Sequence, residues 1–256
     1  MTYRIRHGDN LTIMREMEDE TIDLIYADPP FCTQRDFGEF DDRWEDGLDG
    51  YIAFMRPRLT AMRLLLKPTG SLYLHCDPTA SHYLKLMLDA IFGRANYRNE
   101  IVWGYAGGGV PKKDYPRKHD TILRYTKSKD WVFSVERKPY GEHGIHGRRA
   151  TDRGGTRSIE LNPNGTPVND WWDDIKPLIN WSQERTGYPT QKPLALLERI
   201  IKASSNAGDV VLDPFCGSGT SGVAAVGLGR SWIGVDSSAV AVETTQQRLK
   251  TVAVVE

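Results

Sequence analysis

The 256-residue chain predicts an α/β fold with a mostly parallel sheet flanked by helices. Apolar runs of strand length alternate with segments of helical periodicity along most of the sequence. Two of the runs, residues 22–27 and 210–212, lead directly into turns rich in Pro or Gly. Because the carboxyl ends of parallel strands meet at one edge of a sheet, where ligands bind, we expect these two turns to share a pocket.

The expected elements cover most of the chain. Apolar runs predict strands at residues 22–27, 71–75, 100–103, 121–125, 210–212 and 232–235. Helical spacing predicts helices at residues 51–66, 79–92, 193–204, 221–227 and 239–249. Residues 134–190 are rich in Gly, Pro, Asn, Arg and Trp and have little periodicity. We therefore expect one domain over residues 1–256 with an embedded, loop-rich insertion for substrate contact.

Composition limits the class of protein. The net charge is −1 and 39% of residues are hydrophobic, as in water-soluble globular chains. No apolar stretch approaches the roughly 20 residues that span a bilayer, and the first residues are not signal-like. The cysteines Cys32, Cys76 and Cys216 are too widely spaced for a metal site. These features predict a cytoplasmic protein without membrane contact, structural metal or disulfide.

The nearly neutral total conceals a basic segment. Residues 104–160 contain 13 Lys and Arg against 7 Asp and Glu, a net charge of +6, so the rest of the chain carries −7. Such an excess can neutralise several phosphates and contribute salt-dependent affinity for nucleic acid. It also fits an ordinary solvated surface, and charge alone leaves both interpretations open.

The turn after residues 210–212 has the features of a nucleotide-type site. Gly217 and Gly219 permit positive φ and close backbone approach, and the helix that begins near Thr220 presents unpaired N–H groups. The spacing matches neither a dinucleotide fingerprint nor a phosphate loop. Asp236 ends the next strand, where α/β nucleotide sites hold ribose hydroxyls. The pattern predicts an adenosine-containing ligand without a pyrophosphate.

The turn after residues 22–27 reads Asp-Pro-Pro-Phe and predicts a site for a base. Two prolines make the turn rigid. Asp28 can accept a hydrogen bond from an exocyclic amino group, and Phe31 offers a flat face for an extruded base. An ordinary proline-rich strand exit, with Phe31 in the core, stays open. The functional interpretation is attack by an amino nitrogen on an electrophilic methyl group.

Together, these motifs resemble those of the DNA amino-methyltransferases, which use S-adenosylmethionine to methylate N6 of adenine or N4 of cytosine. The order, catalytic motif first and cofactor motif last, is similar to the β class. Further segments resemble the core of type III modification subunits: residues 7–10, 63–74, 77, 99–103, 118–127 and 190–193. The resemblance implies a Rossmann-like methyltransferase fold and methylation of adenine N6 in DNA, within a restriction-modification context.

The resemblance also implies roles for single residues. The catalytic set is Asp28, Pro29, Pro30 and Phe31. The cofactor-binding set is Asp9, Thr190, Gln191, Lys192, Asp213, Phe215, Gly217, Ser218, Gly219 and Asp236. Within it, Asp236 would hold the ribose hydroxyls, Lys192 the methionine carboxylate and Asp9 the adenine. The expected DNA contacts are Lys112, Lys113, Arg117, Arg148, Arg149, Arg153 and Arg157.

The chain lacks the large recognition insert of type III subunits, so residues 131–188 are the expected target-recognition region. The Trp171-Trp172 pair in it suits either DNA contact or the core. A short recognition region is compatible with a homodimer, and the resemblance leaves a homodimer and a restriction partner open.

Several alternatives remain. An N4-cytosine enzyme shares the whole architecture, and Asp28 in place of serine only favours adenine. A C5-cytosine enzyme needs a nucleophilic cysteine in a Pro-Cys setting, which neither Cys32 nor Cys216 has. Methylases of RNA or of protein glutamine usually have the cofactor motif first. A catalytically inactive DNA-binding subunit is the alternative from another class, and the intact motifs argue against it.

Overall fold

The computed structural model describes residues 2–106, 109–140 and 162–252. It contains two compact units, the first formed by residues 1–133 with 170–256 and the second by residues 134–169. In the described residues, no helix is both long and apolar enough to cross a membrane. Of the elements in the described ranges, the large sheet and the helices belong to the first unit.

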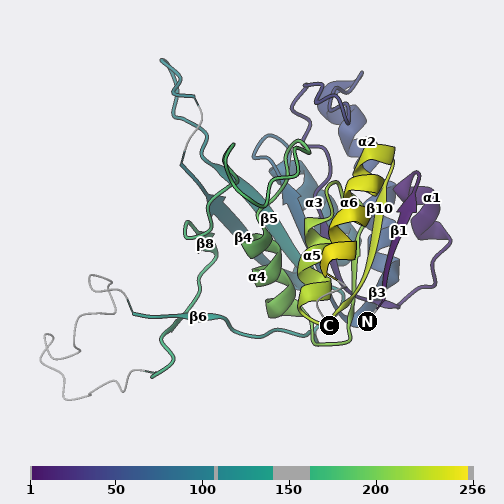
Figure 1. Cartoon of the computed structure of the whole chain (residues 1–256), viewed down its shortest axis with the longest axis vertical. Helices are drawn as coiled ribbons and strands as arrows, with labels where there is room; N and C mark the ends of the chain where they lie inside the picture. The colour runs from purple at the N-terminus through teal and green to yellow at the C-terminus, as the bar shows by residue number, and fades with distance from the viewer. Residues whose placement is uncertain (1, 107–108, 141–161, 253–256) are drawn as a thin grey trace, which may run out of the picture. The chain divides into compact units, whose positions relative to one another are not determined.

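The elements of the first unit alternate along the chain (Figure 1). Its strands are β1 (Tyr3–His7), β2 (Ile22–Ala27), β3 (Leu66–Cys76), β4 (Tyr97–Gly104), β5 (His119–Thr126), β8 (Trp171–Trp172), β9 (Val210–Asp213) and β10 (Ser231–Asp236). Its α-helices are α1 (Asn10–Arg15), α2 (Gly47–Leu65), α3 (Ser81–Phe92), α4 (Leu194–Ser204), α5 (Thr220–Gly227) and α6 (Ala239–Val252). A 3₁₀ turn, Arg94–Asn96, precedes β4.

The eight strands lie in the order β1-β10-β9-β2-β3-β5-β4-β8. Strands β1, β10, β9, β2 and β3 pair in parallel, and β8 is parallel to β4. Strand β5 is antiparallel to both of its neighbours. From β2 the chain continues to one side of the sheet and from β9 to the other. The ends of these two adjacent strands therefore form the switch point at which α/β sheets bind ligands.

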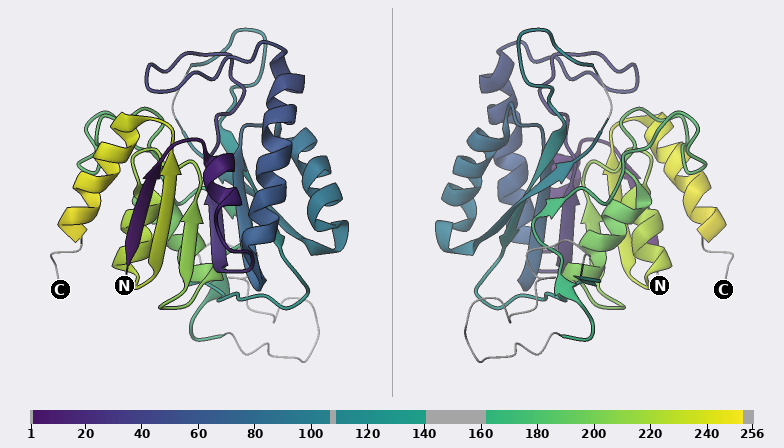
Figure 2. Two further views of the ribbon diagram at one scale, coloured as in Figure 1. Left: turned by 90° about the vertical axis from the view of Figure 1, so that its right-hand side faces the viewer. Right: turned by 90° about the vertical axis from the view of Figure 1, so that its left-hand side faces the viewer.

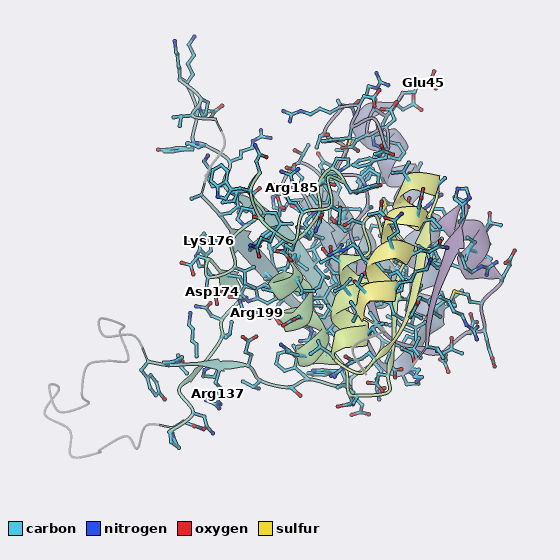
Figure 3. The ribbon with its side chains drawn as sticks, in the orientation of Figure 1. Glu45, Arg137, Asp174, Lys176, Arg185 and Arg199 are labelled. Carbon is cyan, nitrogen blue, oxygen red and sulfur yellow. The ribbon has the colours of Figure 1, made fainter. Side chains whose placement is uncertain are left out.

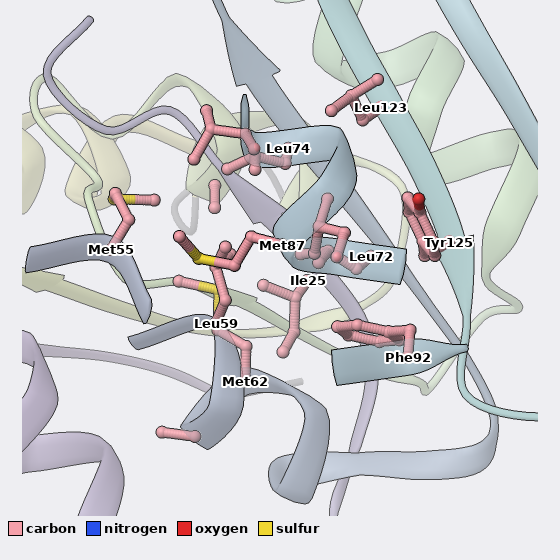
Figure 4. Close-up of a cluster of buried hydrophobic side chains, with 14 of the residues drawn as sticks. Ile25, Met55, Leu59, Met62, Leu72, Leu74, Met87, Phe92, Leu123 and Tyr125 are labelled. Carbon is pink, nitrogen blue, oxygen red and sulfur yellow. The ribbon is translucent and has the colours of Figure 1, made fainter. Parts of the chain in front are cut away.

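Two groups of helices cover the sheet. Helices α1, α2 and α3 pack together on one face, and α4, α5 and α6 pack together on the other (Figures 1 and 2). The main hydrophobic cluster lies between the sheet and helices α2 and α3, where Leu59 and Met62 meet Leu72, Leu74 and Phe92 (Figure 4). The predicted mostly parallel α/β fold is confirmed.

Strand β2 lies at the centre of the sheet and is almost wholly buried, as expected for a strand covered on both faces. Asp23 is its polar exception. Its carboxylate accepts from Lys67 Nζ (2.8 and 2.9 Å), and its Oδ2 also accepts from the Val210 N–H of β9 (2.9 Å). These hydrogen bonds compensate for the cost of placing a carboxylate there.

The sequence pattern did not predict some elements, and the reasons are physical. Strand β1 is an edge strand in which basic residues alternate with Tyr and Ile, and α1 has only six residues, so neither has a long apolar run. The predicted helix at 51–66 and strand at 71–75 left residues 67–70 between them, but these four residues belong to β3, whose register against β2 shifts there. A Cβ at Gly70 would lie 2.8 Å from the Leu66 side chain and 3.1 Å from the backbone oxygens of Ile22 and Asp23, so a larger residue would crowd the strand there. The antiparallel direction of β5 leaves no trace in its composition.

The second unit contains the strands β6 (Arg137–Lys138) and β7 (Thr166–Pro167), which pair antiparallel. Arg137 Nη1 donates to the Gly165 carbonyl oxygen (2.9 Å), and the Val168 N–H donates to that of Glu136 (2.9 Å). The predicted recognition region, residues 131–188, extends beyond this unit at both ends. Its role in target recognition stays a prediction.

The core cluster gives a prediction about stability. Replacing the fully buried Leu59 by Ala should lower the free energy of unfolding by about 2–5 kcal/mol, because it removes apolar contacts and leaves a cavity. Leu64 of the same helix is 45% exposed, so Leu64→Ala should change it by less than about 0.5 kcal/mol. Urea unfolding of both variants measures the difference; equal losses would contradict this account of the core.

Candidate active site

A cavity opens at the carboxyl edge of the sheet, beside the ends of β2 and β9. Its empty volume is about 890 Å³, including open solvent at its mouth, which is large enough for a small-molecule ligand. Four stretches of chain line it, within residues 26–42, 188–197, 213–221 and 236–237. The predicted residues found in its wall are Asp28, Pro29, Pro30, Phe31, Thr190, Gln191, Lys192, Asp213, Phe215, Gly217, Ser218 and Asp236.

The turn after β9 depends on its glycines. Gly217 and Gly219 both have positive φ, +48° and +74°. A Cβ on Gly219 would lie 2.5 Å from the Thr245 side chain, so only glycine fits at the start of α5. Gly219 itself is outside the cavity wall, but it sets the position of Gly217 and Ser218, which are in it. The turn thus brings backbone close to any bound ligand.

Asp236 at the end of β10 offers hydrogen-bond acceptors to the cavity. Its Oδ2 accepts from the Gly217 N–H (2.8 Å) and its Oδ1 from the Ser238 N–H (2.9 Å). Burial raises the pKa of this carboxyl, and the backbone donors partly oppose that shift. Each oxygen keeps a second lone pair, so the ionised group can still accept from ligand hydroxyls.

Asp213 holds the turn together. Its Oδ1 accepts from the Phe215 N–H (3.0 Å) and its Oδ2 from the Ser221 hydroxyl (2.5 Å). Complete burial, with smaller contributions from the charges of Asp28 and Asp236, raises the pKa of Asp213 to about 7. Asp213 therefore stays partly protonated near neutral pH, and this reduces its repulsion with the two nearby carboxylates.

Asp28 and Lys192 meet in the cavity, although 164 residues separate them. Lys192 Nζ donates to Asp28 Oδ2 at 2.7 Å and lies 4.9 Å from the centre of the Phe31 ring. Asp28 Oδ1 is buried and has no hydrogen-bond partner among the described residues. An unpaired buried acceptor is costly, so this atom is suited to receive a donor from a ligand.

The segment before α4 is held in place by its own hydrogen bonds. Gln191 Oε1 accepts from the N–H and the hydroxyl of Thr186 (2.9 Å each), and Gln191 Nε2 donates to the Glu184 carbonyl oxygen (2.7 Å). Thr190 has a positive φ of 58°. This arrangement orients Lys192 toward Asp28.

Sequence reasoning missed one wall of the cavity, formed by residues 33–42. Phe37 and Phe40 stack on each other (4.9 Å between ring centres) and line the cavity. Asp42 is buried and accepts from the N–H groups of Cys32 (2.8 Å) and Thr33 (2.7 Å). The signal available in the sequence was Asp42 between the aromatic residues Phe40 and Trp44, in the segment that follows the proline turn.

Tyr188 also lines the cavity and was not predicted. Its ring lies 3.2 Å from where a Cβ on Gly217 would stand, so the tyrosine packs directly against the glycine turn. Burial raises the pKa of its hydroxyl, which therefore stays protonated at neutral pH.

Asp9 does not line the cavity. It accepts from the Thr12 N–H (2.9 Å) at the start of α1 and pairs with Arg58 (2.5 Å). The neighbouring Asn10 donates to the Pro214 carbonyl oxygen (2.7 Å), so this segment supports the turn after β9 from behind. Contact between Asp9 and a cofactor adenine stays a prediction.

The expected DNA contacts lie elsewhere. Lys112, Lys113 and Arg117 are exposed on the connection between β4 and β5. Because β4 runs in the same direction as β3, this connection leaves the same edge of the sheet as the cavity. The other four, Arg148, Arg149, Arg153 and Arg157, lie outside the described residues.

The two tryptophans of β8 differ. Trp171 is 53% exposed, whereas Trp172 is buried. Arg199 of α4 lies over the Trp172 ring (5.2 Å) and pairs with Asp174 (2.7 Å), and Figure 3 shows these two charged side chains pointing toward each other. One tryptophan thus belongs to the core and the other to the surface.

Several known proteins are similar to this chain. The family described as DNA methylase, covering N6 and N4 enzymes, matches residues 22–247. Type II methyltransferase M.BamHI of Bacillus amyloliquefaciens is 33% identical over 91% of this chain, which spans 54% of that enzyme's length. DNA adenine methyltransferase YhdJ of Escherichia coli K12 is 32% identical, and the aligned residues cover 96% of this chain and 82% of the length of YhdJ. A crystal structure of M1.HpyAVI in complex with SAM is similar, with a TM-score of 0.65, 25% identity and coverage of 97% and 99% of the two chains.

The raised pKa of Asp213 predicts how stability depends on pH. The folded protein keeps a proton that the unfolded chain, with a carboxyl pKa of 3.8, releases, so this stabilising contribution is complete below about pH 4 and is lost as the pH rises through about 7. Asp213→Asn carries no such proton. From pH 4 to pH 8 its free energy of unfolding should therefore rise relative to wild type, by about 1.4 kcal/mol for each unit of pKa shift.

Urea unfolding across this pH range tests the prediction. The control is Asp209→Asn, which removes a partly exposed carboxylate just before the other end of β9. An Asp213→Asn curve that stays parallel to wild type would contradict the raised pKa.

Proposed function

This chain belongs to the DNA methylase family, and from that premise we propose that it transfers a methyl group from S-adenosylmethionine to an exocyclic amino group in DNA, with N6 of adenine as the target. The observation that carries the proposal is the buried, unpaired Oδ1 of Asp28, within the described residues, in the wall of a cavity that also contains Asp236. An amino group has the N–H donor that this oxygen lacks.

The residues present fit S-adenosylmethionine. Asp236 has acceptor lone pairs left for the ribose hydroxyls, and Gly217 permits close backbone approach. Lys192 supplies a cation for the methionine carboxylate. The cofactor has a positive sulfur and a positive amino group, and the cavity wall contains four carboxyl groups, those of Asp28, Asp42, Asp213 and Asp236. When bound, S-adenosylmethionine supplies an electrophilic methyl group.

The chain's own residues would then orient the base. The Phe31 ring offers a stacking face, and Pro29 and Pro30 keep the turn rigid. Asp28 would accept a hydrogen bond from the amino group, and this would orient the nitrogen lone pair toward the methyl group of the cofactor. No covalent bond to the protein is needed, so positioning and electrostatics account for the catalysis.

The choice of base rests on two facts. The first position of the Asp-Pro-Pro-Phe motif is Asp28 and not serine, which favours adenine. The similar protein YhdJ is an adenine methyltransferase. The amino group of cytosine presents the same donors, so an N4-cytosine enzyme is the alternative and an outcome of the test.

DNA as the substrate fits the basic connection between β4 and β5. The remaining DNA contacts, a homodimer, a restriction partner and a cytoplasmic location stay predictions.

The first test is direct. Purified protein is incubated with unmethylated DNA and methyl-labelled S-adenosylmethionine, and the digested DNA is analysed by nucleoside mass spectrometry. N6-methyladenine is expected. N4-methylcytosine would select the alternative. No methylated nucleoside together with no cofactor binding would favour the inactive DNA-binding subunit, whereas cofactor binding without a product would point to a missing partner or an RNA substrate.

Asp28→Ala should lower the rate of methyl transfer at least about 10²-fold, since it removes the group that accepts from the amino nitrogen. Cofactor affinity, measured by calorimetry, should stay equal or increase, because Lys192 is then free of Asp28. If transfer and cofactor binding are lost together, Asp28 has a structural role instead.

Asp236→Ala should weaken cofactor binding by about tenfold to a hundredfold, because hydrogen bonds to a charged acceptor are lost. Asp209→Ala, which lies away from the cavity, should bind as wild type does. Unchanged affinity in Asp236→Ala would rule out the ribose assignment.

A further inference from the structure

Three of the large hydrophobic side chains in the described residues stand out by their exposure. The exposed fraction is 93% for Tyr115, 80% for Trp181 and 79% for Val110, whereas the other exposed ones stay at 64% or below. Single hydrophobic side chains are common on protein surfaces. These three, however, lie on two loops that leave the same edge of the sheet, and none of them has a part in the mechanism so far.

Both loops begin at the edge of the sheet where the cavity opens. Strand β8 pairs in parallel with β4, and β4 runs in the same direction as β3, so these three strands end at the cavity edge. Residues 109–118 belong to the connection that follows β4, which extends past the ends of β4 and β5 in Figure 1. Residues 173–187 follow β8 and lead into the cavity wall at Tyr188. Because β4 and β8 are neighbours, the two loops start next to each other beside the cavity.

Hydrogen bonds hold the backbone around Trp181. The Ile179 N–H donates to the Ser182 hydroxyl oxygen (3.0 Å), and the Ser182 N–H donates to the Ile179 carbonyl oxygen (2.9 Å), so a tight turn carries Trp181. The loop is anchored to β4, because Trp103 Nε1 donates to the Ile175 carbonyl oxygen (2.7 Å). A fixed backbone that keeps a tryptophan in solvent makes its indole face available to a partner, since little further ordering is needed on binding.

Tyr115 lies among basic residues. Residues 109–118 contain one acidic residue, Asp114, and four basic ones, for a net charge of +3: Lys112, Lys113, Arg117 and Lys118. Aromatic faces among cations match a nucleic acid strand, in which bases alternate with phosphates. Another protein bound at this edge would obstruct the path of a base to the cavity, whereas DNA brings the base with it. DNA is therefore the partner that these loops fit.

We propose that Tyr115 and Trp181 are base-stacking residues, which hold DNA beside the cavity by contact with bases that become unstacked when the target base leaves the helix. Extrusion of a base removes the stacking contacts of both of its neighbours and leaves their flat faces uncovered. Aromatic side chains can cover such faces whatever the sequence, because every base has a π face. The inference rests on the proposed function, in which the target base belongs to DNA.

The first test measures the affinity for a fluorescently labelled single-stranded oligonucleotide of mixed sequence. Its bases are free to stack, and no recognition sequence is needed. Tyr115→Ala and Trp181→Ala should each weaken binding about fivefold to a hundredfold, the range for loss of one base–aromatic stack. Tyr115→Phe and Trp181→Phe keep an aromatic face and should bind within about threefold of wild type. Fluorescence anisotropy of the labelled strand gives the affinities.

Salt separates stacking from charge. A plot of log affinity against log salt concentration should have the wild-type slope in both alanine variants, because neither side chain displaces a counterion from a phosphate. Lys112→Ala removes a cation and should reduce the slope by about 0.7. Tyr83→Ala is the matched control, since Tyr83 is an exposed tyrosine (53%) on α3, and it should bind as wild type does. The affinity for S-adenosylmethionine should stay at the wild-type value in every variant, because none of these side chains lines the cavity.

Methyl transfer to unmethylated duplex DNA is measured in parallel, and its rate at low DNA concentration should fall in both alanine variants. The proposal is overturned if wild type has no affinity for single strands, if both alanine variants bind them as wild type does, or if the phenylalanine variants lose as much affinity as the alanine variants. If wild type transfers no methyl group to DNA, the proposed function fails, and the strand affinities still decide the role of Tyr115 and Trp181.

Discussion

The parallel pairing of β2 with β9 is the constraint on which the site depends. Leu24 lies opposite Val211 and Ile25 opposite Leu212, so the two strands end together. The Asp23 carboxylate, which accepts from the Val210 N–H, joins the strands at the opposite end. Because the chain leaves β2 and β9 toward different sides, no crossing segment closes the gap between their ends. Asp28 and Asp213 therefore flank a cavity instead of a packed core.

Packing four carboxyl groups around one cavity has an electrostatic cost, and the structure reduces it in different ways. Asp28 has Lys192, Asp42 and Asp236 have backbone N–H donors, and Asp213 has a raised pKa. Each device relieves repulsion without removing the negative character of the wall. The result suits a ligand that is positively charged where it reacts.

Much of the fold and part of the site could be predicted from the sequence, because apolar runs and the turns behind them are local signals. The Asp28 and Asp213 motifs are of this kind. Lys192 was predicted as a partner for a ligand carboxylate, but its pairing with Asp28 depends on the folding of distant segments. The positive φ values of Cys32 and Gln34, which shape the wall at residues 33–42, have no signature in residue type. The antiparallel direction of β5 likewise has no signature in residue type.

The role of Asp42 has a consequence for how this kind of site can change. Its carboxylate fixes the start of the wall by accepting from Cys32 and Thr33, and its own N–H donates to the Arg35 carbonyl oxygen (2.9 Å). The stretch between these anchors, with Phe37 and Phe40, thus forms a loop of its own after the rigid proline turn at Asp28. Substitutions there can reshape the rim of the cavity while the reacting centre keeps its geometry, so evolution and engineering can vary substrate preference in one place and preserve the chemistry in another.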